Sequence, residues 1–335
     1  LGKQGRYSSP VLGKTFPKII DEMADTRIDL LSQDTANPKK TFATLQSTIT
    51  PSSKLLNLIM GAGLSISDFS QLQEGELILL RYEKTETIKN PSFRDYKDTS
   101  KTHRLRSEVA EINDWISGLN IELSRELANK YDVNERHLRR YFTCNNTDFT
   151  MGGRLFGGFW LSVGKEERKR DLKLDGEQIA VLDVSSLNPT LLYRRINKSP
   201  PAGDAYRVAG LEDSRQGIKK VFNSMLFSNS APTRFPKDTK RWFPAGVTIV
   251  QVVSAIREKH PEISHLLDSS IGHELQNEES NVIVAALLLA KSRGISALPI
   301  HDALIVAASK KEEGKEIFRD AFRSILNIDP VIKEE

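Results

Sequence analysis

Apolar residues recur at helical spacing in several long segments of the chain. In the segment 104–127, Val109, Ile112 and Ile116 fall on one face of a helix. The same spacing predicts further helices over residues 17–31, 212–227, 247–259 and 274–293, and within the last 25 residues. The N-terminal region, residues 1–140, is therefore expected to be mostly helical, and we place a second domain at residues 141–335.

Three short apolar runs indicate strands instead. Glu76–Tyr82 is one, and Ile179–Val184 is a second that carries Asp183 near its end. The third, Leu298–Val306, is interrupted by His301 and Asp302, which predicts a β-hairpin with a polar tip. Helices combined with a small antiparallel sheet give an α+β (mixed α/β) fold class.

Asp183 and Asp302 are the first candidates for chemistry, because each ends an apolar strand. Either residue could instead be an ordinary turn or helix-cap residue. If the fold brings them within ~4 Å, their repulsion costs about 4 kcal/mol at an effective dielectric near 20. A divalent cation would remove that cost, and a site made only of oxygen ligands favours Mg²⁺ or Mn²⁺ over zinc.

The predicted helix 212–227 carries a second candidate site. Arg215, Lys219, Asn223 and Phe227 are four residues apart and share one helical face. Two cations on one face could clamp a triphosphate. The alternative is a solvated Lys/Arg face without a ligand.

Two more stretches suggest contact with phosphates. Arg136, Arg139 and Arg140 lie beside aromatic residues, which would suit nucleic-acid phosphates or simply a solvated helix end. Arg154 sits in a run of glycines (Thr150–Trp160), where the backbone could pass close to a ligand or form a plain turn.

Composition narrows the class of protein. The chain has 335 residues, a net charge of +4, a pI near 8.9 and one cysteine, so a disulfide framework and a cysteine zinc site are excluded. This suits a reducing cytoplasm, where we expect the protein to act. No apolar run reaches the roughly 18 residues of a membrane span, so no membrane partner is expected.

Three motifs in order resemble motifs A, B and C of family A DNA polymerases and of the related single-subunit, phage-type RNA polymerases. They are Asp183 in LDVSSLNP, Arg215-x-x-x-Lys219 followed by Phe227, and His301-Asp302. The Thr150–Arg154 stretch is similar to a T-x-G-R segment ahead of motif A. The resemblance covers roughly residues 140–320, and the chain looks like the compact polymerases of phages and mobile elements.

The resemblance implies a polymerase palm with a small antiparallel sheet and helical fingers, residues 1–140 being a reduced thumb or an accessory region. It implies template-directed nucleotidyl transfer, most simply DNA-dependent DNA synthesis in replication. The implied partners are a primer–template, nucleoside triphosphates and a protein that supplies processivity.

The resemblance also implies roles for the candidate residues. Two Mg²⁺ ions (or Mn²⁺) would be held by Asp183, Asp302 and the Val184 carbonyl. The implied nucleotide-binding residues are Arg215, Lys219, Asn188 and Phe227, Lys219 also donating a proton to pyrophosphate. The implied nucleic-acid-binding residues are Arg154, His301, Arg136, Arg139 and Arg140.

This sequence departs from the family pattern at three positions. Asn188 stands where the DNA enzymes usually carry a glutamate that excludes the ribose 2′-hydroxyl, Ala303 follows the His-Asp pair, and Phe227 replaces a tyrosine. A primase or an RNA polymerase that uses ribonucleotides therefore stays open. A non-catalytic nucleic-acid-binding protein with a degenerate palm is the other alternative.

Overall fold

The computed structural model describes residues 5–7, 15–34, 48–64, 75–83, 92–144 and 148–335. The chain divides into two compact units, residues 1–76 and 77–335, which we treat separately. The larger unit begins just before the strand Ile78–Tyr82. Within the described ranges, none of the helices has the length and apolar character needed to cross a bilayer.

The smaller unit contains two helices and a strand pair among its described residues. The antiparallel pair has Leu31 opposite Pro51, and the side chains of its second strand are exposed. Its elements are α1 (Phe16–Ala24), β1 (Leu31–Asp34), β2 (Thr48–Pro51) and α2 (Ser53–Gly61).

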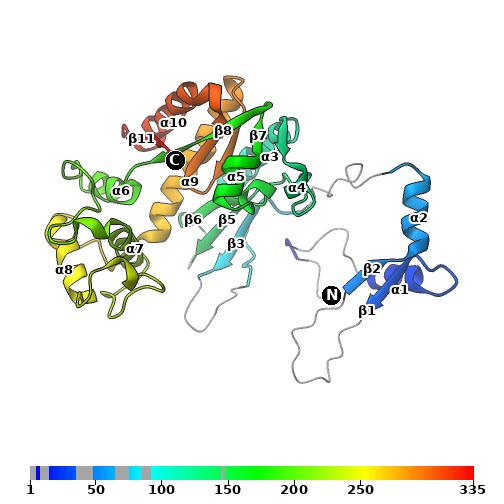
Figure 1. The fold of residues 1–335 in the computed structure, drawn as a ribbon, viewed down its shortest axis with the longest axis horizontal. Coiled ribbons are helices and arrows are strands. Elements are labelled where there is room, and N and C mark those ends of the chain that lie inside the picture. Colours follow the sequence, from blue (N-terminus) through cyan, green and yellow to red (C-terminus); the bar gives the residue numbers. More distant parts are fainter. Residues whose placement is uncertain (1–4, 8–14, 35–47, 65–74, 84–91, 145–147) are drawn as a thin grey trace. The chain divides into compact units, whose positions relative to one another are not determined.

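The larger unit is a mixed α/β structure (Figure 1). Its helices are α3 (Ser100–Ser117), α4 (Arg125–Ala128), α5 (Lys165–Asp171), α6 (Leu187–Arg195), α7 (Arg215–Leu226), α8 (Ile249–Lys259), α9 (Gly272–Ser292) and α10 (Lys311–Leu326). Its strands are β3 (Ile78–Tyr82), β4 (Ile121–Leu123), β5 (Arg139–Cys144), β6 (Gly152–Phe156), β7 (Leu172–Leu174), β8 (Glu177–Val184), β9 (Ala297–Ile300), β10 (Ala303–Ala307) and β11 (Ile332–Glu334).

A six-stranded antiparallel sheet organises this unit, in the order β4-β7-β8-β10-β9, with β11 paired to β8. β8 pairs with β10 on one side, Leu182 opposite Leu304, and with β11 on the other, Asp183 opposite Lys333. The predicted hairpin is confirmed: β9 and β10 are joined by His301 and Asp302 alone. Because β8 and β10 are neighbours, the ends that carry the two aspartates lie on the same edge of the sheet.

Helices cover the sheet and explain the long apolar runs. α10 packs so closely on β8 and β10 that a Cβ at Gly314 would lie 2.9 Å from the Leu182 side chain. α9 packs against α10, α3 and β6, and buries Val282, Ile283 and Leu287. Burial on several sides accounts for a helix that is apolar on most faces.

A smaller sheet, β3-β5-β6, packs against α9. β3 and β5 run parallel, and β5 and β6 antiparallel. The segment 136–142, which could have been a helix end, is therefore mostly a strand. The predicted helix over 104–127 ends earlier, at Ser117, because Gly118 caps it and Ile121–Leu123 pairs with β7.

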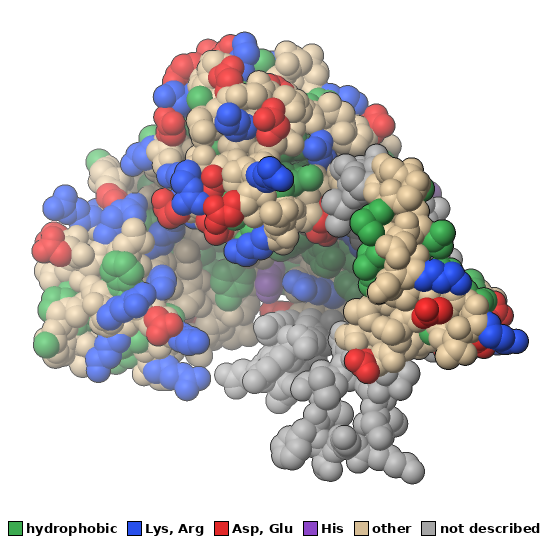
Figure 2. Space-filling model, turned by 45° about the vertical axis from the view of Figure 1, so that its right-hand side comes forward, with side chains coloured by type: hydrophobic (Ala, Val, Ile, Leu, Met, Phe, Trp, Pro, Cys, Tyr) green, Lys and Arg blue, Asp and Glu red, His purple; other side chains and the backbone are tan. Residues whose placement is uncertain are grey.

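Residues 197–271, with α7 and α8, form what we call the helical lobe, at the left of Figure 1 beside α6. Its exposed segment 228–247 carries four basic side chains, Arg234, Lys237, Lys240 and Arg241, and one acidic one. Lys and Arg side chains predominate over acidic ones on the part of the lobe visible at the left of Figure 2. This surface is thus electropositive.

Candidate functional site

A small cavity of about 180 Å³ lies where the end of β8, the tip of the β9–β10 hairpin, α7 and the start of α9 meet. We call it the aspartate pocket. Eight residues that the sequence singled out line it: Arg154, Asp183, Val184, Asn188, Lys219, Asn223, Phe227 and Asp302. Ser186, Leu187, Tyr206, Gly272 and Gln276 complete the lining.

The two aspartates meet in this pocket although they are far apart in the sequence. Asp183 is held on the central strand, and Asp302 on a two-residue turn whose other member, His301, has a positive φ of 53°. Trp160 supports the hairpin from behind, where its Nε1 donates to the Pro299 carbonyl oxygen at 2.9 Å.

Burial raises the pKa of Asp183 to about 6, and the charges of Asp302 and Glu335 add to the rise. The Val184 backbone amide, which donates to Asp183 Oδ1 at 2.7 Å, and the charge of Lys219 oppose it. The pocket therefore holds negative charge at a cost that a cation would relieve.

The donors present fit Mg²⁺ or Mn²⁺. Two carboxylates and a backbone carbonyl are hard oxygen ligands, and both ions accept water in their remaining positions. Among the residues that the structure describes, the pocket included, no group of three or more His, Cys, Asp or Glu side chains is placed to hold a metal. The pocket itself offers two carboxylates, those of Asp183 and Asp302.

α7 supplies a basic, amide and aromatic side of the pocket. Lys219, Asn223 and Phe227 follow one another along one helical face, as their spacing predicts. Asn188 Nδ2 donates to Asn223 Oδ1 at 3.0 Å, so the two amides form one polar patch.

Phe227 is 43% exposed, and its ring lies on the backbone of Gly272, where an added Cβ would come within 2.6 Å of the ring. His273 meets the ring edge-on, with centroids 5.1 Å apart. A flat, accessible ring beside a charged pocket is suited to stacking on a base.

Arg154 contributes to the pocket wall through a bidentate ion pair. Its Nε and Nη2 donate to the two carboxylate oxygens of Glu279 on α9, at 2.7 and 2.9 Å. Glu279 is 3% exposed, and burial raises its pKa to about 7 even though Arg154 opposes the rise. The structure therefore commits much of the Arg154 guanidinium to a protein partner.

Arg215 lies just outside the lining of the pocket. Its Nε donates to Asp204 Oδ2, and its guanidinium lies over the ring of Tyr206, which does line the pocket. The predicted pair of cations therefore divides, with Lys219 in the cavity and Arg215 behind Tyr206.

Within the arginine cluster at residues 136–140, Arg136 and Arg140 form hydrogen bonds to other parts of the protein. Arg140 is fully buried and donates to the Gly153 carbonyl and to Asn281 Oδ1, so a phosphate cannot reach it; burial lowers its pKa to about 10. Arg136 donates to the backbone carbonyls of Leu119, Ile121 and Val133. Arg139 is half-buried on β5.

His301 is exposed at the hairpin tip, next to the pocket but not among its lining residues. Its ring lies 6.0 Å from that of Phe156. This position is compatible with contact to a ligand that approaches the pocket from solvent.

The sequence did not assign four residues of this region to the site. Glu279 lies in the polar first half of a helix whose apolar second half belongs to the core. Helix capping explained that polar half equally well. Asp204 and Tyr206 lie in a segment without periodicity, and Gln276 has no distinguishing pattern. Only the four-residue spacing along α9 from Gly272 to Gln276 to Ser280 would have pointed to a face there.

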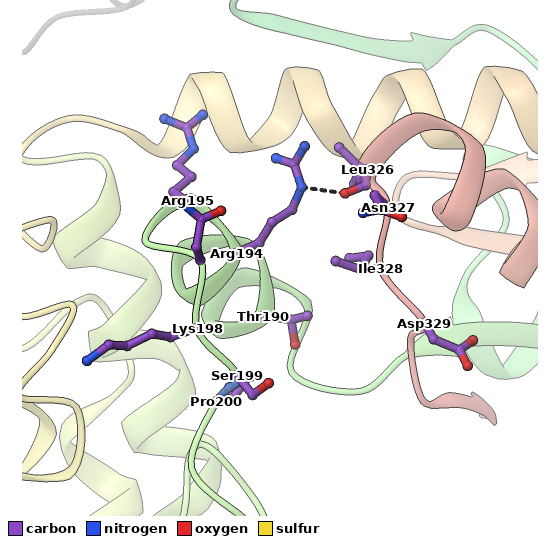
Figure 3. A pocket seen from close by; sticks show the side chains of 11 residues that line it. Thr190, Arg194, Arg195, Lys198, Ser199, Pro200, Leu326, Asn327, Ile328 and Asp329 are labelled. Carbon is purple, nitrogen blue, oxygen red and sulfur yellow. Dashed lines mark hydrogen bonds between the residues drawn. The ribbon is translucent and has the colours of Figure 1, made fainter.

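A larger cavity of about 770 Å³ lies elsewhere, between α6 and the end of α10 (Figure 3). Its cations are engaged: Arg194 donates to the Leu326 carbonyl, Arg195 pairs with Glu278, and Lys198 pairs with Glu262. Size alone therefore does not mark the site.

No family model and no curated protein matches this chain. Among solved structures, it is similar to the "POL domain of Pol1 from M. smegmatis complex with DNA primer-template and dNTP", at 11% identity and a TM-score of 0.34. The match covers 70% of this chain and 50% of that one, so the chain spans about half the length of that structure. A TM-score of this size does not establish a common fold.

Proposed function

We propose that the protein is a template-directed nucleotidyltransferase, in the first place a DNA-dependent DNA polymerase of the family A type that uses two Mg²⁺ ions. The observation that carries the proposal is the convergence of Asp183, Asp302 and Lys219 in one cavity, next to an exposed aromatic ring. In this assignment the sheet is the palm and the helical lobe is the fingers.

Each side of the pocket has a task in this reaction. Lys219 binds the triphosphate and donates a proton to the pyrophosphate that leaves when the bond between the α-phosphorus and its bridging oxygen breaks. Phe227 stacks near the new base pair, and the Asn188–Asn223 amides face the sugar. His301 contacts the primer end, whose 3′-hydroxyl attacks the α-phosphorus.

Asp183, Asp302 and the Val184 carbonyl would hold the metal ions, as the oxygen-only donor set allows. When bound, they would lower the pKa of the attacking hydroxyl and neutralise charge on the leaving group. The electropositive helical lobe supports a polyanionic partner, whose binding should weaken with salt.

Primer extension by isosteric variants tests the proposal. Asp183→Asn and Asp302→Asn should each lower incorporation by about a thousandfold or more, in line with removal of a charged group that acts in the transition state. Asp175→Asn is the matched control, because Asp175 is exposed in the β7–β8 turn of the same sheet, with a positive φ that asparagine also tolerates. Undiminished synthesis by either pocket variant would refute the assignment.

Synthesis of RNA is the second candidate. It is favoured by the hydrogen bond between Asn188 and Asn223, which puts neutral amides at the expected sugar position in place of a carboxylate. Assays with ribonucleotides alone, with and without a primer, distinguish the two. Binding of nucleic acid that ignores Mg²⁺, with no incorporation of either nucleotide, would indicate the non-catalytic alternative.

A further inference from the structure

The segment Asp204–Tyr206 holds Arg215 from two sides. Arg215 begins α7, and its Nε donates to Asp204 Oδ2. The Tyr206 ring lies beneath the guanidinium, 5.7 Å from its central carbon to the ring centroid. One guanidinium edge and one face are therefore fixed by residues only two positions apart.

Asp204 is itself fixed. Its Oδ1 accepts from the Tyr206 backbone amide at 2.9 Å, so each carboxylate oxygen has one donor. Burial raises the pKa of Asp204, but the hydrogen bonds from Arg215 and Tyr206 lower it by more, to below its usual range. The carboxyl group is therefore ionised at neutral pH.

The same segment is anchored from behind by buried groups. His260, which ends α8, lies 2.8 Å through Nε2 from the Ala205 carbonyl oxygen and 3.3 Å through Nδ1 from the Tyr193 hydroxyl. Phe222 of α7 meets both the Tyr206 and the His260 rings, at 5.6 Å in each case. Tyr206 and His260 are each 1% exposed, so both side chains that anchor this segment are part of the core.

This arrangement engages Arg215 at Nε, the inner edge of its guanidinium. That bond uses one of the five N–H donors of the guanidinium, and the two terminal nitrogens carry the other four. Tyr206 lines the cavity and Arg215 does not, although its guanidinium lies over the Tyr206 ring, so the guanidinium lies at the cavity's border and not inside it.

We propose that Asp204 is a positioning residue, which holds the Arg215 guanidinium at the border of the aspartate pocket for the outer phosphates of an incoming nucleoside triphosphate. This inference rests on the proposed function. It adds to that function a role for the Asp204 carboxylate and for Tyr206 and His260, which hold the segment in place. Fixing a long side chain before the ligand arrives removes an ordering cost from binding.

Steady-state kinetics of the full chain test it. Asp204→Ala should raise the KM for the nucleotide by about five- to tenfold, the cost of ordering one long side chain, while kcat changes little. Asp204→Asn retains one acceptor oxygen but loses the negative charge. It should therefore show a smaller rise in KM. The matched control is Glu262→Gln, which removes an exposed carboxylate from the Lys198 ion pair of the same lobe.

A double-mutant cycle separates positioning from general loosening. In an Arg215→Met background, Asp204→Ala should cause no further rise in KM, because the group that it positions is gone. An additional rise of the same size would overturn the proposal, as would an unchanged KM in Asp204→Ala protein whose circular dichroism matches wild type.

Calorimetric titration with inorganic tripolyphosphate, without nucleic acid, keeps this inference separate from the proposed function. Weaker binding by both Asp204→Ala and Arg215→Met supports positioning even if the chain incorporates no nucleotide, which would refute polymerase activity alone. Incorporation by wild type with unaltered tripolyphosphate binding in Asp204→Ala refutes positioning alone.

Discussion

Replacing Asp183 by asparagine should stabilise the metal-free protein at alkaline pH. Burial and the neighbouring Asp302 charge raise the pKa of Asp183 from 3.8 to about 6 in the folded chain. The folded state thus retains this proton to a higher pH than the unfolded chain does. The contribution of this carboxyl to stability is complete below about pH 4 and is lost as pH rises through about 6.

The size of the effect follows from the shift. One pKa unit corresponds to about 1.4 kcal/mol, so the full shift is about 3 kcal/mol. Because Asp183 is only half-buried, we reduce this to about 1–2 kcal/mol. Asp183→Asn should therefore gain about 1–2 kcal/mol at pH 8 and nothing at pH 4, with a rise in Tm of about 2–4 °C per kcal/mol.

The assay is urea or thermal unfolding with a chelator present, at pH 4 and pH 8, beside the exposed control Asp175→Asn. Adding Mg²⁺ at pH 8 should then stabilise wild type and leave Asp183→Asn unchanged, since the variant lacks one of the proposed ligands. The reasoning is refuted if Asp183→Asn is less stable than wild type at pH 8, or if its free energy of unfolding differs from that of wild type by the same amount at both pH values. The ionised carboxylate would then not destabilise the folded state.

Three further outcomes are expected. Asn188→Glu should raise the preference for deoxy- over ribonucleotides by about tenfold or more, as a ratio of kcat/KM values, because a carboxylate would meet the 2′-hydroxyl; an unchanged ratio would move the sugar away from this residue. Gly272→Ala should displace the Phe227 ring and raise the nucleotide KM several-fold with little loss of stability, and an unaltered KM would argue against stacking. Arg140→Met should cost about 3–5 kcal/mol in urea unfolding, because it leaves its buried partners without a donor, yet the salt dependence of nucleic-acid binding should stay as in wild type; a shallower dependence would place Arg140 at a phosphate after all.

The sequence allowed the sheet and much of the pocket to be predicted because local pattern and tertiary position agree there. The run before Asp183 and the runs around His301-Asp302 are apolar at consecutive positions, as strands buried on both faces must be. Likewise, Lys219, Asn223 and Phe227 follow one another at steps of four residues, which fixes their common direction once α7 forms. These features depend on periodicity, which a single sequence contains.

The arginines around residue 140 show where such reasoning fails. Arg139 and Arg140 are adjacent on β5 and therefore face opposite ways, but composition cannot say which of them the core receives. Arg140 is buried because α9 packs against the smaller sheet and supplies Ser280 and Asn281. The same long-range contact places Glu279 against Arg154. Neither pairing could be predicted from the sequence, because each joins residues that are far apart along the chain.

The charges around the aspartate pocket bear on the metal–nucleotide complex that we propose for it. Glu279 and Arg154 neutralise one another within the wall, which leaves two aspartates opposed by Lys219 alone in the lining. A triphosphate without a cation would be repelled by the two carboxylates, and a cation without a triphosphate would meet Lys219 nearby. The two ligands together satisfy both sides, so binding of Mg²⁺ and of nucleotide should each strengthen the other, and a titration of either one in the presence of the other would measure that coupling.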